Sequence, residues 1–557
     1  MSDIENQTKS DGILVQDESG VLGEMINLTN SLYHDADADL ESEYQDRNSI
    51  IYKVPSQRPP ASSESNNDDD VDTIESFSPD DVGSSIKKTR SIVSTGPSLT
   101  KVKTRFFSPR LQTQRRKVVL HFFTTLGVFI VFIFTIFPLF WGSNSYTYKY
   151  FHKIKVLAVM QDEGYTQGMM ASSVVPLTAA VSQMIPLIPG TWSVFNTSSF
   201  NELYHTSNST EIDHKVTERI YHEFYWLAVN VRPNATEKLW NSLVNASAPP
   251  FNSSEMFEVT YESGRDPSNV KGVILPIMQS LETAFSKYYT TTYFPSLLAN
   301  VTKAYPNITF NPENLAAAGS MKFGYVDYRP FFRRGIITSS QIGVVYALVL
   351  TAFQFLVYAP LHMEMSQLLT VRQYICYRVL ISFVSLFFIS LFFSTVSAMF
   401  GFDFTVAFGR GGFMIYWMTT WLFMVACAGA NENMVSLVFL YKPQFMGFWI
   451  LSFVIINLGP SLFPMALDNV FYRYGYAMPI HNAVDVYRVI LMDLSRRHMG
   501  RNFGILVAWV VVNTIAQPFV ILFGARVNKR RAMAAAAAAA EAAANGNPPP
   551  KGKASLL

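Results

Sequence analysis

The chain has 557 residues, of which 49% are hydrophobic and only 15% are charged, and its formal net charge at pH 7 is +2. Soluble domains carry about 25% charged residues, so this composition excludes a wholly soluble protein, and the hydrophobic residues gather in stretches long enough to cross a bilayer. The only two cysteines, Cys376 and Cys427, lie at or within such stretches, which excludes a disulfide framework for the polar part of the chain.

Residues 1–100 are predicted to form a disordered cytoplasmic tail, because they are rich in Ser, Asp, Glu and Asn and cannot bury enough apolar surface to offset the entropy of ordering. Ser78 and Ser108 each precede a proline and are candidate phosphorylation sites, although Ser-Pro pairs are also common in tails that carry no phosphate. Residues 101–117 are predicted to be a basic juxtamembrane segment.

The first transmembrane span is predicted over residues 118–141. The start of the chain lacks the pattern of a secretory signal peptide, so we expect this span to act as an uncleaved signal anchor. Arg115, Arg116 and Lys117 precede it, and the positive-inside rule therefore places the N-terminal tail in the cytoplasm.

Residues 142–334 are predicted to be a glycosylated extracellular or lumenal domain of mixed α and β structure. Its apolar pattern predicts strands at 155–161 and 225–231, a helix after Pro233 and a further helix at 282–289. The domain holds a concentration of N-glycosylation sequons, which favours its position outside the cytoplasm. The candidate glycosylation sites are Asn196, Asn208, Asn234, Asn245, Asn252, Asn300 and Asn307.

Residues 341–525 are predicted to be a membrane domain of five spans, which with the first span makes six. The fold class expected is therefore a polytopic α-helical membrane protein of six spans, with the α+β domain inserted between spans one and two. An even number of spans also places the C-terminal tail, residues 526–557, in the cytoplasm. The five predicted spans are 341–361, 378–400, 412–430, 447–467 and 504–525.

One loop disagrees with this topology. Residues 468–503 are predicted to face outward, yet they contain five arginines, which the positive-inside rule favours on the cytoplasmic side. Either the topology is wrong there, or the segment is a structured, partly re-entrant element tied to the extracellular domain. We favour the second interpretation, because the sequons and the two basic ends fix the remaining topology.

Two polar clusters are candidates for a substrate path. Asn431, Glu432 and Asn433 are predicted at the end of the fourth span, where they could line a substrate or proton path or simply reach water at a helix end. The second cluster lies in the loop before the last span, where Asp485 and Arg488 are three residues apart and can pair on a helix. Packing and ion pairing are the alternative role for that cluster, which comprises Asp468, Arg473, His481, Asp485 and Arg488.

No motif for catalysis or cofactor binding is visible in the sequence. A phosphate-binding glycine loop, a completed two-histidine zinc motif and a nucleophile elbow are all missing. We therefore expect no enzymatic activity, cofactor, metal or nucleic-acid partner, and rank a glycosylated ectoenzyme as the weakest hypothesis.

Several stretches resemble the fungal nitrosoguanidine-resistance membrane protein family over about residues 118–530. They are FPLFWGS, KVLAVMQDE, WLAVNVRPNAT, FYRYGYAMPIHNAVDVYRVI and GRNFGILVAWVVVN. That family is similar in architecture to phage-infection-type proteins and to the membrane subunits of type-two ABC exporters, which have six spans and a re-entrant element before the last span. The resemblance would explain the arginine-bearing loop 468–503.

The resemblance implies a plasma-membrane protein that confers resistance to nitrosoguanidine and other toxic compounds. It would act as an export permease or by affecting phospholipid asymmetry. Its partners would be the lipid bilayer, a small-molecule or lipid substrate, and a second copy or a separate energising partner, because the chain has no ATPase domain. The alternative is a non-transporting adaptor or regulator that signals through the extracellular domain and the phosphorylatable tail.

Overall fold

The computed structural model describes residues 112–145, 147–163 and 174–544. The predicted disordered tail, the candidate phosphorylation sites Ser78 and Ser108, and most of the basic juxtamembrane segment lie outside these residues. From Arg116 onward the chain forms one compact unit, to which the following description applies.

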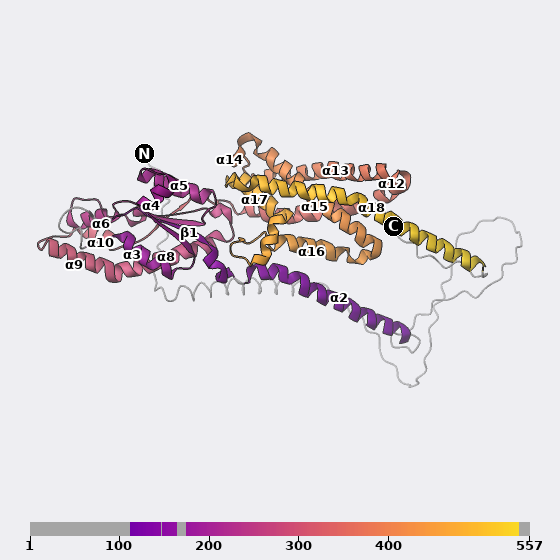
Figure 1. Ribbon diagram of the computed structural model, residues 1–557, viewed down its shortest axis with the longest axis horizontal. Helices are drawn as coiled ribbons and strands as arrows, with labels where there is room; N and C mark the ends of the chain where they lie inside the picture. The colour runs from indigo at the N-terminus through magenta and orange to yellow at the C-terminus, as the bar shows by residue number, and fades with distance from the viewer. Residues whose placement is uncertain (1–111, 146, 164–173, 545–557) are drawn as a thin grey trace, which may run out of the picture. The chain divides into compact units, whose positions relative to one another are not determined.

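The inserted domain, residues 142–334, is built around a mixed five-stranded sheet (Figure 1). The strand order is β2-β1-β3-β4-β5; β1 pairs in parallel with β2 and β3, β3 pairs antiparallel with β4, and β4 pairs in parallel with β5. Two of these strands, β1 and β3, occupy the segments predicted to be strands. The strands are β1 (Lys155–Met160), β2 (Thr191–Asn196), β3 (Leu227–Val231), β4 (Phe257–Tyr261) and β5 (Gly324–Asp327).

Helices cover both faces of this sheet (Figure 1). Successive strand side chains point to opposite faces, so Leu157 and Val159 pack with α4 and α5 while Val156 and Ala158 pack with α3, α6 and α8. Burial on both faces explains why β1 reads as an unbroken apolar run. The helices are α3 (Leu177–Met184), α4 (Thr197–Tyr204), α5 (Ser209–Tyr221), α6 (Ala235–Val244), α7 (Ser253–Met256), α8 (Leu275–Tyr288), α9 (Phe294–Ala304) and α10 (Pro312–Ala318).

Five helical stretches within the described residues are long and apolar enough to cross a membrane. Helix α15 lies at the centre of the group that follows the inserted domain, in contact with α12, α13, α17 and α18. The helices are α2 (Gln112–Asn144), α11 (Gly335–Ile337), α12 (Gly343–Leu368), α13 (Val371–Met399), α14 (Thr405–Phe408), α15 (Gly412–Tyr441), α16 (Met446–Leu458), α17 (Pro479–Met492) and α18 (Met499–Ala544).

Two predicted spans differ in length from the helices that occupy them. The fourth span was predicted to end at Ala430, but α15 continues to Tyr441, so Asn431–Asn433 lie inside a helix. The fifth was predicted over 447–467, but α16 has only 13 residues, and the chain is irregular around Pro460 and Pro464. With α16 this short, five long helices are present among the described residues where six spans were predicted.

Gly324 should be one of the least replaceable residues of the sheet. A Cβ at this position in β5 would overlap the backbone carbonyl of Ser254, which cannot move away as a flexible side chain can. We expect Gly324→Ala to lower the free energy of unfolding by about 1–3 kcal/mol, measured as a fall in the apparent melting temperature of the purified protein. Gly272→Ala is the matched control, because a methyl group there would meet no atom within 4 Å; equal melting temperatures for both variants would contradict the prediction.

Candidate functional site

The segment between α16 and α18 folds into an interrupted helical element. It contains a 3-10 helix (Val470–Ala477), then α17, then a 3-10 turn (Arg496–His498). Pro479 opens α17, where its missing N–H costs nothing, and Asp493 ends the helix with a left-handed φ of 51°. Helix α17 packs against α15 and α18 and also contacts Ser263–Arg265 of the inserted domain. The segment is therefore structured and tied to the inserted domain, as we expected for 468–503.

A cavity of about 710 Å³ lies where this element meets the inserted domain. The inserted domain contributes Glu223 and Asp266 to its wall, and the interrupted element contributes residues from Ser461 onward. Of the eight predicted substrate-path residues, five line this cavity and three do not. The five are Asp468, Arg473, His481, Asp485 and Arg488.

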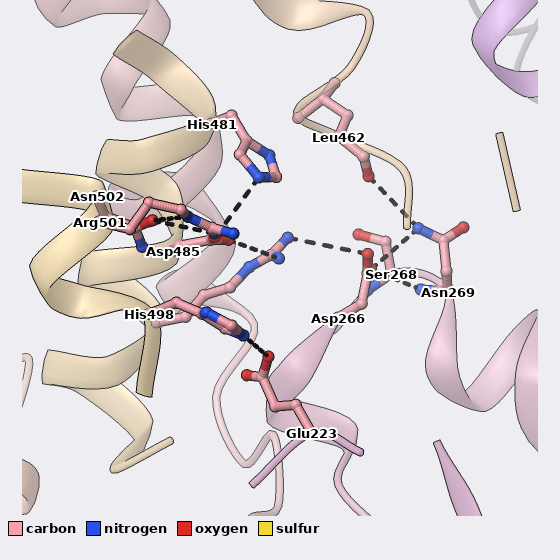
Figure 2. Close-up of polar contacts among 11 residues, drawn as sticks. Glu223, Asp266, Ser268, Asn269, Leu462, His481, Asp485, His498, Arg501 and Asn502 are labelled. Carbon is pink, nitrogen blue, oxygen red and sulfur yellow. Dashed lines mark hydrogen bonds and ion pairs between the residues drawn. The ribbon is translucent and has the colours of Figure 1, made fainter. Parts of the chain in front are cut away.

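Asp485 is the centre of the charge cluster in the cavity wall (Figure 2). Its carboxylate lies 3.5 Å from His481 Nε2 and 3.9 Å from both Arg488 Nη1 and Arg501 Nη2. The pairing of Asp485 with Arg488, predicted from their spacing, is thus confirmed. The pairs at 3.9 Å are too long for hydrogen bonds. Arg501 donates instead to the side-chain oxygen of Asn502, and Arg488 Nε and Nη2 have no hydrogen-bond partner among the described residues.

Asp266 brings a second carboxylate to the same cluster, from the inserted domain. It accepts hydrogen bonds from the side chain of Asn269 at 2.9 Å and from the backbone of Ser268 at 3.2 Å, and Arg488 Nη2 lies 3.9 Å away. Burial raises the pKa of Asp266, while Arg488 and the hydrogen bonds of Asn269 oppose that rise. Because Asp266 belongs to one part of the fold and Arg488 to the other, this contact joins the two across the cavity.

Two further contacts cross the same boundary. Figure 2 shows His498, just before α18, directed at Glu223, and the distance between Nε2 and Oε2 is 3.8 Å. Outside the cavity, Arg329 of the inserted domain pairs with Asp493 at 3.0 Å. The interrupted element is therefore held to the inserted domain by charged groups from several elements.

Asp468 is the most isolated carboxylate of the cavity. Its side chain is 3% exposed, and neither carboxylate oxygen has a hydrogen-bond partner among the described residues. Lys153 approaches it, but donates its hydrogen bond to the backbone carbonyl of Asp468 at 2.8 Å. Burial raises the pKa of Asp468 to about 7; Lys153 opposes this and Asp266 reinforces it.

Asn431, Glu432 and Asn433 lie elsewhere, in the interior of the helix bundle. They are at most 7% exposed, so the interpretation of a helix end in water is wrong. Glu432 pairs with Arg378 of α13 at 3.1 Å and accepts a hydrogen bond from Gln517 of α18 at 3.0 Å. The physical reason is that each residue of the triplet has a hydrogen-bond partner on a neighbouring helix, which lets α15 continue through it.

The two asparagines of the triplet extend this polar layer. Asn431 donates to Thr351 of α12 at 2.9 Å and accepts from Trp449 of α16 at 3.1 Å. Asn433 donates to the carbonyl of Asn513 of α18 at 3.0 Å. Together with Glu432 the triplet contacts α12, α13, α16 and α18, an arrangement suited to fixing how the helices pack.

Sequence reasoning missed the cavity residues Glu223, Arg265, Asp266, His498 and Arg501. Arg265 lies 3.6 Å from the centre of the Trp226 ring and donates to the Tyr225 carbonyl. In the sequence, Arg501 was counted only as one of the five arginines in the loop 468–503 and not as a candidate site residue. For Glu223 and Asp266, local sequence carried no signal, because their partners His498 and Arg488 are more than 200 positions away in the chain.

The predicted glycosylation sites lie on the surface of the inserted domain. Six of the seven asparagines are exposed, and Asn300 is half-buried. Asn196 caps α4 through its side-chain oxygen, which accepts from the Ser199 amide, so its side-chain nitrogen is not used in the cap. The positions of these side chains are compatible with glycans.

Comparison with known proteins gives a family and a relative. A family model described as a protein of unknown function, DUF3533, matches residues 126–515. Over 431 residues the chain is 48% identical to the uncharacterized endoplasmic reticulum membrane protein YJR015W of Saccharomyces cerevisiae, a match that covers 77% of this chain and 84% of that protein. No solved structure matches. The family match includes the inserted domain, the interrupted element and the cavity between them.

Proposed function

Because the chain belongs to the DUF3533 family and is an integral membrane protein, we propose that it is a permease that exports small toxic compounds, nitrosoguanidine among them, or redistributes lipids across its membrane. The observation that carries the proposal is the cavity of about 710 Å³ between the inserted domain and the interrupted element. A cavity of this size suits a small molecule. Its wall combines charged side chains with apolar ones such as Phe463 and Met465.

The proposed topology has six spans and both termini in the cytoplasm. The short α16 serves as the fifth span together with the irregular chain that follows it, and the inserted domain faces outward with its sequons. The interrupted element before α18 supports the likeness to phage-infection-type proteins and type-two ABC exporters, in which a re-entrant element precedes the last span. An energising partner or a second copy is part of the proposal, and catalytic chemistry is not.

The proposed location is the plasma membrane. The relative YJR015W is named as an endoplasmic reticulum membrane protein, so the endoplasmic reticulum is the competing location. Fluorescence microscopy of the full-length chain with a C-terminal tag distinguishes the two, and glycan trimming by endoglycosidase H provides a second readout. Retention in the endoplasmic reticulum would move the proposed export to that membrane and away from the cell surface.

Asp485 provides the functional test. We expect Asp485→Asn to reduce resistance to nitrosoguanidine by about tenfold in a deletion strain, because a charge shared by His481, Arg488 and Arg501 is lost. Resistance is measured as the inhibitory concentration, together with energised efflux of labelled compound from vesicles. Asp403→Asn is the matched control; the exposed Asp403 accepts hydrogen bonds from the amide and the hydroxyl of Thr405, and an asparagine oxygen can replace it.

The outcomes separate permease from adaptor. If the Asp485→Asn protein is present at normal abundance but loses both resistance in cells and efflux in vesicles, the result supports the permease. If purified wild-type protein gives no flux with any ion gradient or ATPase partner, the permease fails. If deletion of residues 1–100 then abolishes resistance at normal abundance, the non-transporting regulator takes its place.

A further inference from the structure

The cavity contains opposite charges that do not satisfy each other. Asp468 has two carboxylate oxygens without hydrogen-bond partners among the described residues, and Arg488 has two nitrogens, Nε and Nη2, in the same condition. Asp468 is 3% exposed and Arg488 9% exposed, so both groups are buried in the cavity wall. Buried polar groups left unsatisfied are costly, and where they line a cavity they point to a ligand.

The wider charge balance of the cavity favours an anion close to Arg488. Six lysines and arginines line the wall against four carboxylates, and three histidines lie among them. Arg473 has no ion-pair partner among the described residues, while Arg501 donates to the side-chain oxygen of Asn502 and lies 3.9 Å from Asp485. Arginine donors in a partly desolvated wall are suited to phosphate or carboxylate groups.

The isolated carboxylate favours a cation at a second position. Asp468 faces Lys153, but Lys153 Nζ bonds to the backbone carbonyl and lies 3.9 Å from the centre of the Tyr150 ring. A carboxylate oxygen of Asp266 lies 3.9 Å from Arg488 Nη2, and the charge of Asp266 also acts on Asp468. Asp266 is therefore an electrostatic neighbour of both unsatisfied groups. Asp468 and Arg488 also line the same cavity of about 710 Å³.

Apolar residues complete the wall. Phe463, Pro464 and Met465 come from the chain that leaves α16, and Val489 and Met499 come from α17 and α18. A molecule bound to the charged groups would have room for an uncharged portion against these side chains.

We propose that this cavity binds a zwitterionic group, with its ammonium at Asp468 and its phosphate or carboxylate at Arg488. The inference rests on the proposed function, since it names the class of compound that the permease would recognise. The group has two sources with the same chemistry, the headgroup of a zwitterionic phospholipid and a free zwitterionic solute.

The test compares ligands on the full-length protein in nanodiscs of phosphatidylglycerol, which has no amine. Glycerophosphoethanolamine is the zwitterion, glycerol 3-phosphate has only the anion and ethanolamine only the cation. By titration calorimetry, we expect the zwitterion to bind at least tenfold more tightly than either. Measurable binding of glycerol 3-phosphate as tight as that of the zwitterion would overturn the proposal without any variant.

Variants locate the two charges. We expect Asp468→Asn to abolish the preference for the zwitterion over glycerol 3-phosphate. We expect Arg488→Gln to weaken the binding of both glycerophosphoethanolamine and glycerol 3-phosphate at least tenfold. Asp403→Asn should keep the wild-type preference. Asp468→Asn replaces an unpaired buried carboxylate with a neutral amide, which favours folding. An Asp468→Asn protein that melts like wild type and keeps the preference would overturn the assignment.

A second arm identifies the source. In nanodiscs that contain phosphatidylethanolamine, native mass spectrometry shows whether that lipid is retained by wild type and lost in Asp468→Asn. If phosphatidylethanolamine is retained and the soluble zwitterion does not bind, the ligand is a lipid headgroup. If the soluble zwitterion binds, the ligand is a free solute. Either result supports the inference and the absence of both would overturn it, while resistance and efflux decide the permease separately.

Discussion

Replacing Glu432 with glutamine should destabilise the helix bundle by about 3–5 kcal/mol, the cost of breaking a buried ion pair. Arg378 and Glu432 are 6% and 3% exposed in their side chains, with 3.1 Å between Arg378 Nη2 and Glu432 Oε2. Without the carboxylate, the arginine is a buried charge with no counter-ion. We expect lower steady-state abundance in cells and a lower apparent melting temperature in detergent.

A double variant tests whether the loss of stability in Glu432→Gln comes from leaving Arg378 as an unpaired buried charge. Arg378→Met combined with Glu432→Leu removes both charges, and apolar replacement of a buried pair is often neutral, so we expect it to recover most of the stability. Glu364→Gln, at an exposed position of α12, is the control. Wild-type abundance and melting temperature in Glu432→Gln, with resistance lost, would instead assign Glu432 to a substrate or proton path.

Glu262 should make the stability of the inserted domain depend on pH. Its side chain is 2% exposed, neither carboxylate oxygen has a hydrogen-bond partner among the described residues, and burial raises its pKa to about 7. Glu223 and Asp327 reinforce the rise, and Arg265 and Arg329 oppose it. The folded protein therefore binds the proton more tightly than the unfolded chain does.

The sign of the effect follows from that difference in proton binding. Stability from Glu262 is fully present below the ordinary pKa of 4.5 and is lost as the pH rises to about 7. The rise of the Glu262 pKa from 4.5 to about 7 corresponds to roughly 3 kcal/mol in the free energy of unfolding. Asp468 acts in the same direction, since its pKa is also raised to about 7.

Glu262→Gln tests this contribution. The neutral amide cannot ionise, so the variant should be more stable than wild type at pH 8 and nearly equal to it at pH 5. Apparent melting temperatures at pH 5, 6.5 and 8 provide the measurement, with Glu202→Gln at an exposed position of α4 as the control. Parallel pH curves for wild type and Glu262→Gln would refute the assignment.

Local patterns predicted local structure well. The apolar runs of β1 and β3 were visible because both strands are buried on two faces. The end of α15 was misplaced, because a hydropathy pattern registers the polarity of Asn431–Asn433 but not their partners on other helices. The end of α16 was also misplaced, although Pro460 and Pro464 are residues that interrupt a regular helix.

The sequence predicted cavity residues of the interrupted element but none of those from the inserted domain. The loop 468–503, expected outside, has an excess of arginine, and the five residues predicted from that segment all line the cavity. Glu223 and Asp266 were not found, because nothing in their neighbourhood is unusual in composition. Their role comes from tertiary contacts with Arg488 and His498, which one sequence cannot reveal.

Helix α18 links the cavity to the polar layer inside the bundle. Its first turn supplies Met499, Arg501 and Asn502 to the cavity, and the same helix carries Gln517 to Glu432. Between Met499 and Gln517 the helix has no proline, and these residues span about 28 Å at 1.5 Å per residue. One helix therefore contacts both the cavity and the buried Glu432, and Pro518, directly after Gln517, marks the place where its regular hydrogen bonding is interrupted.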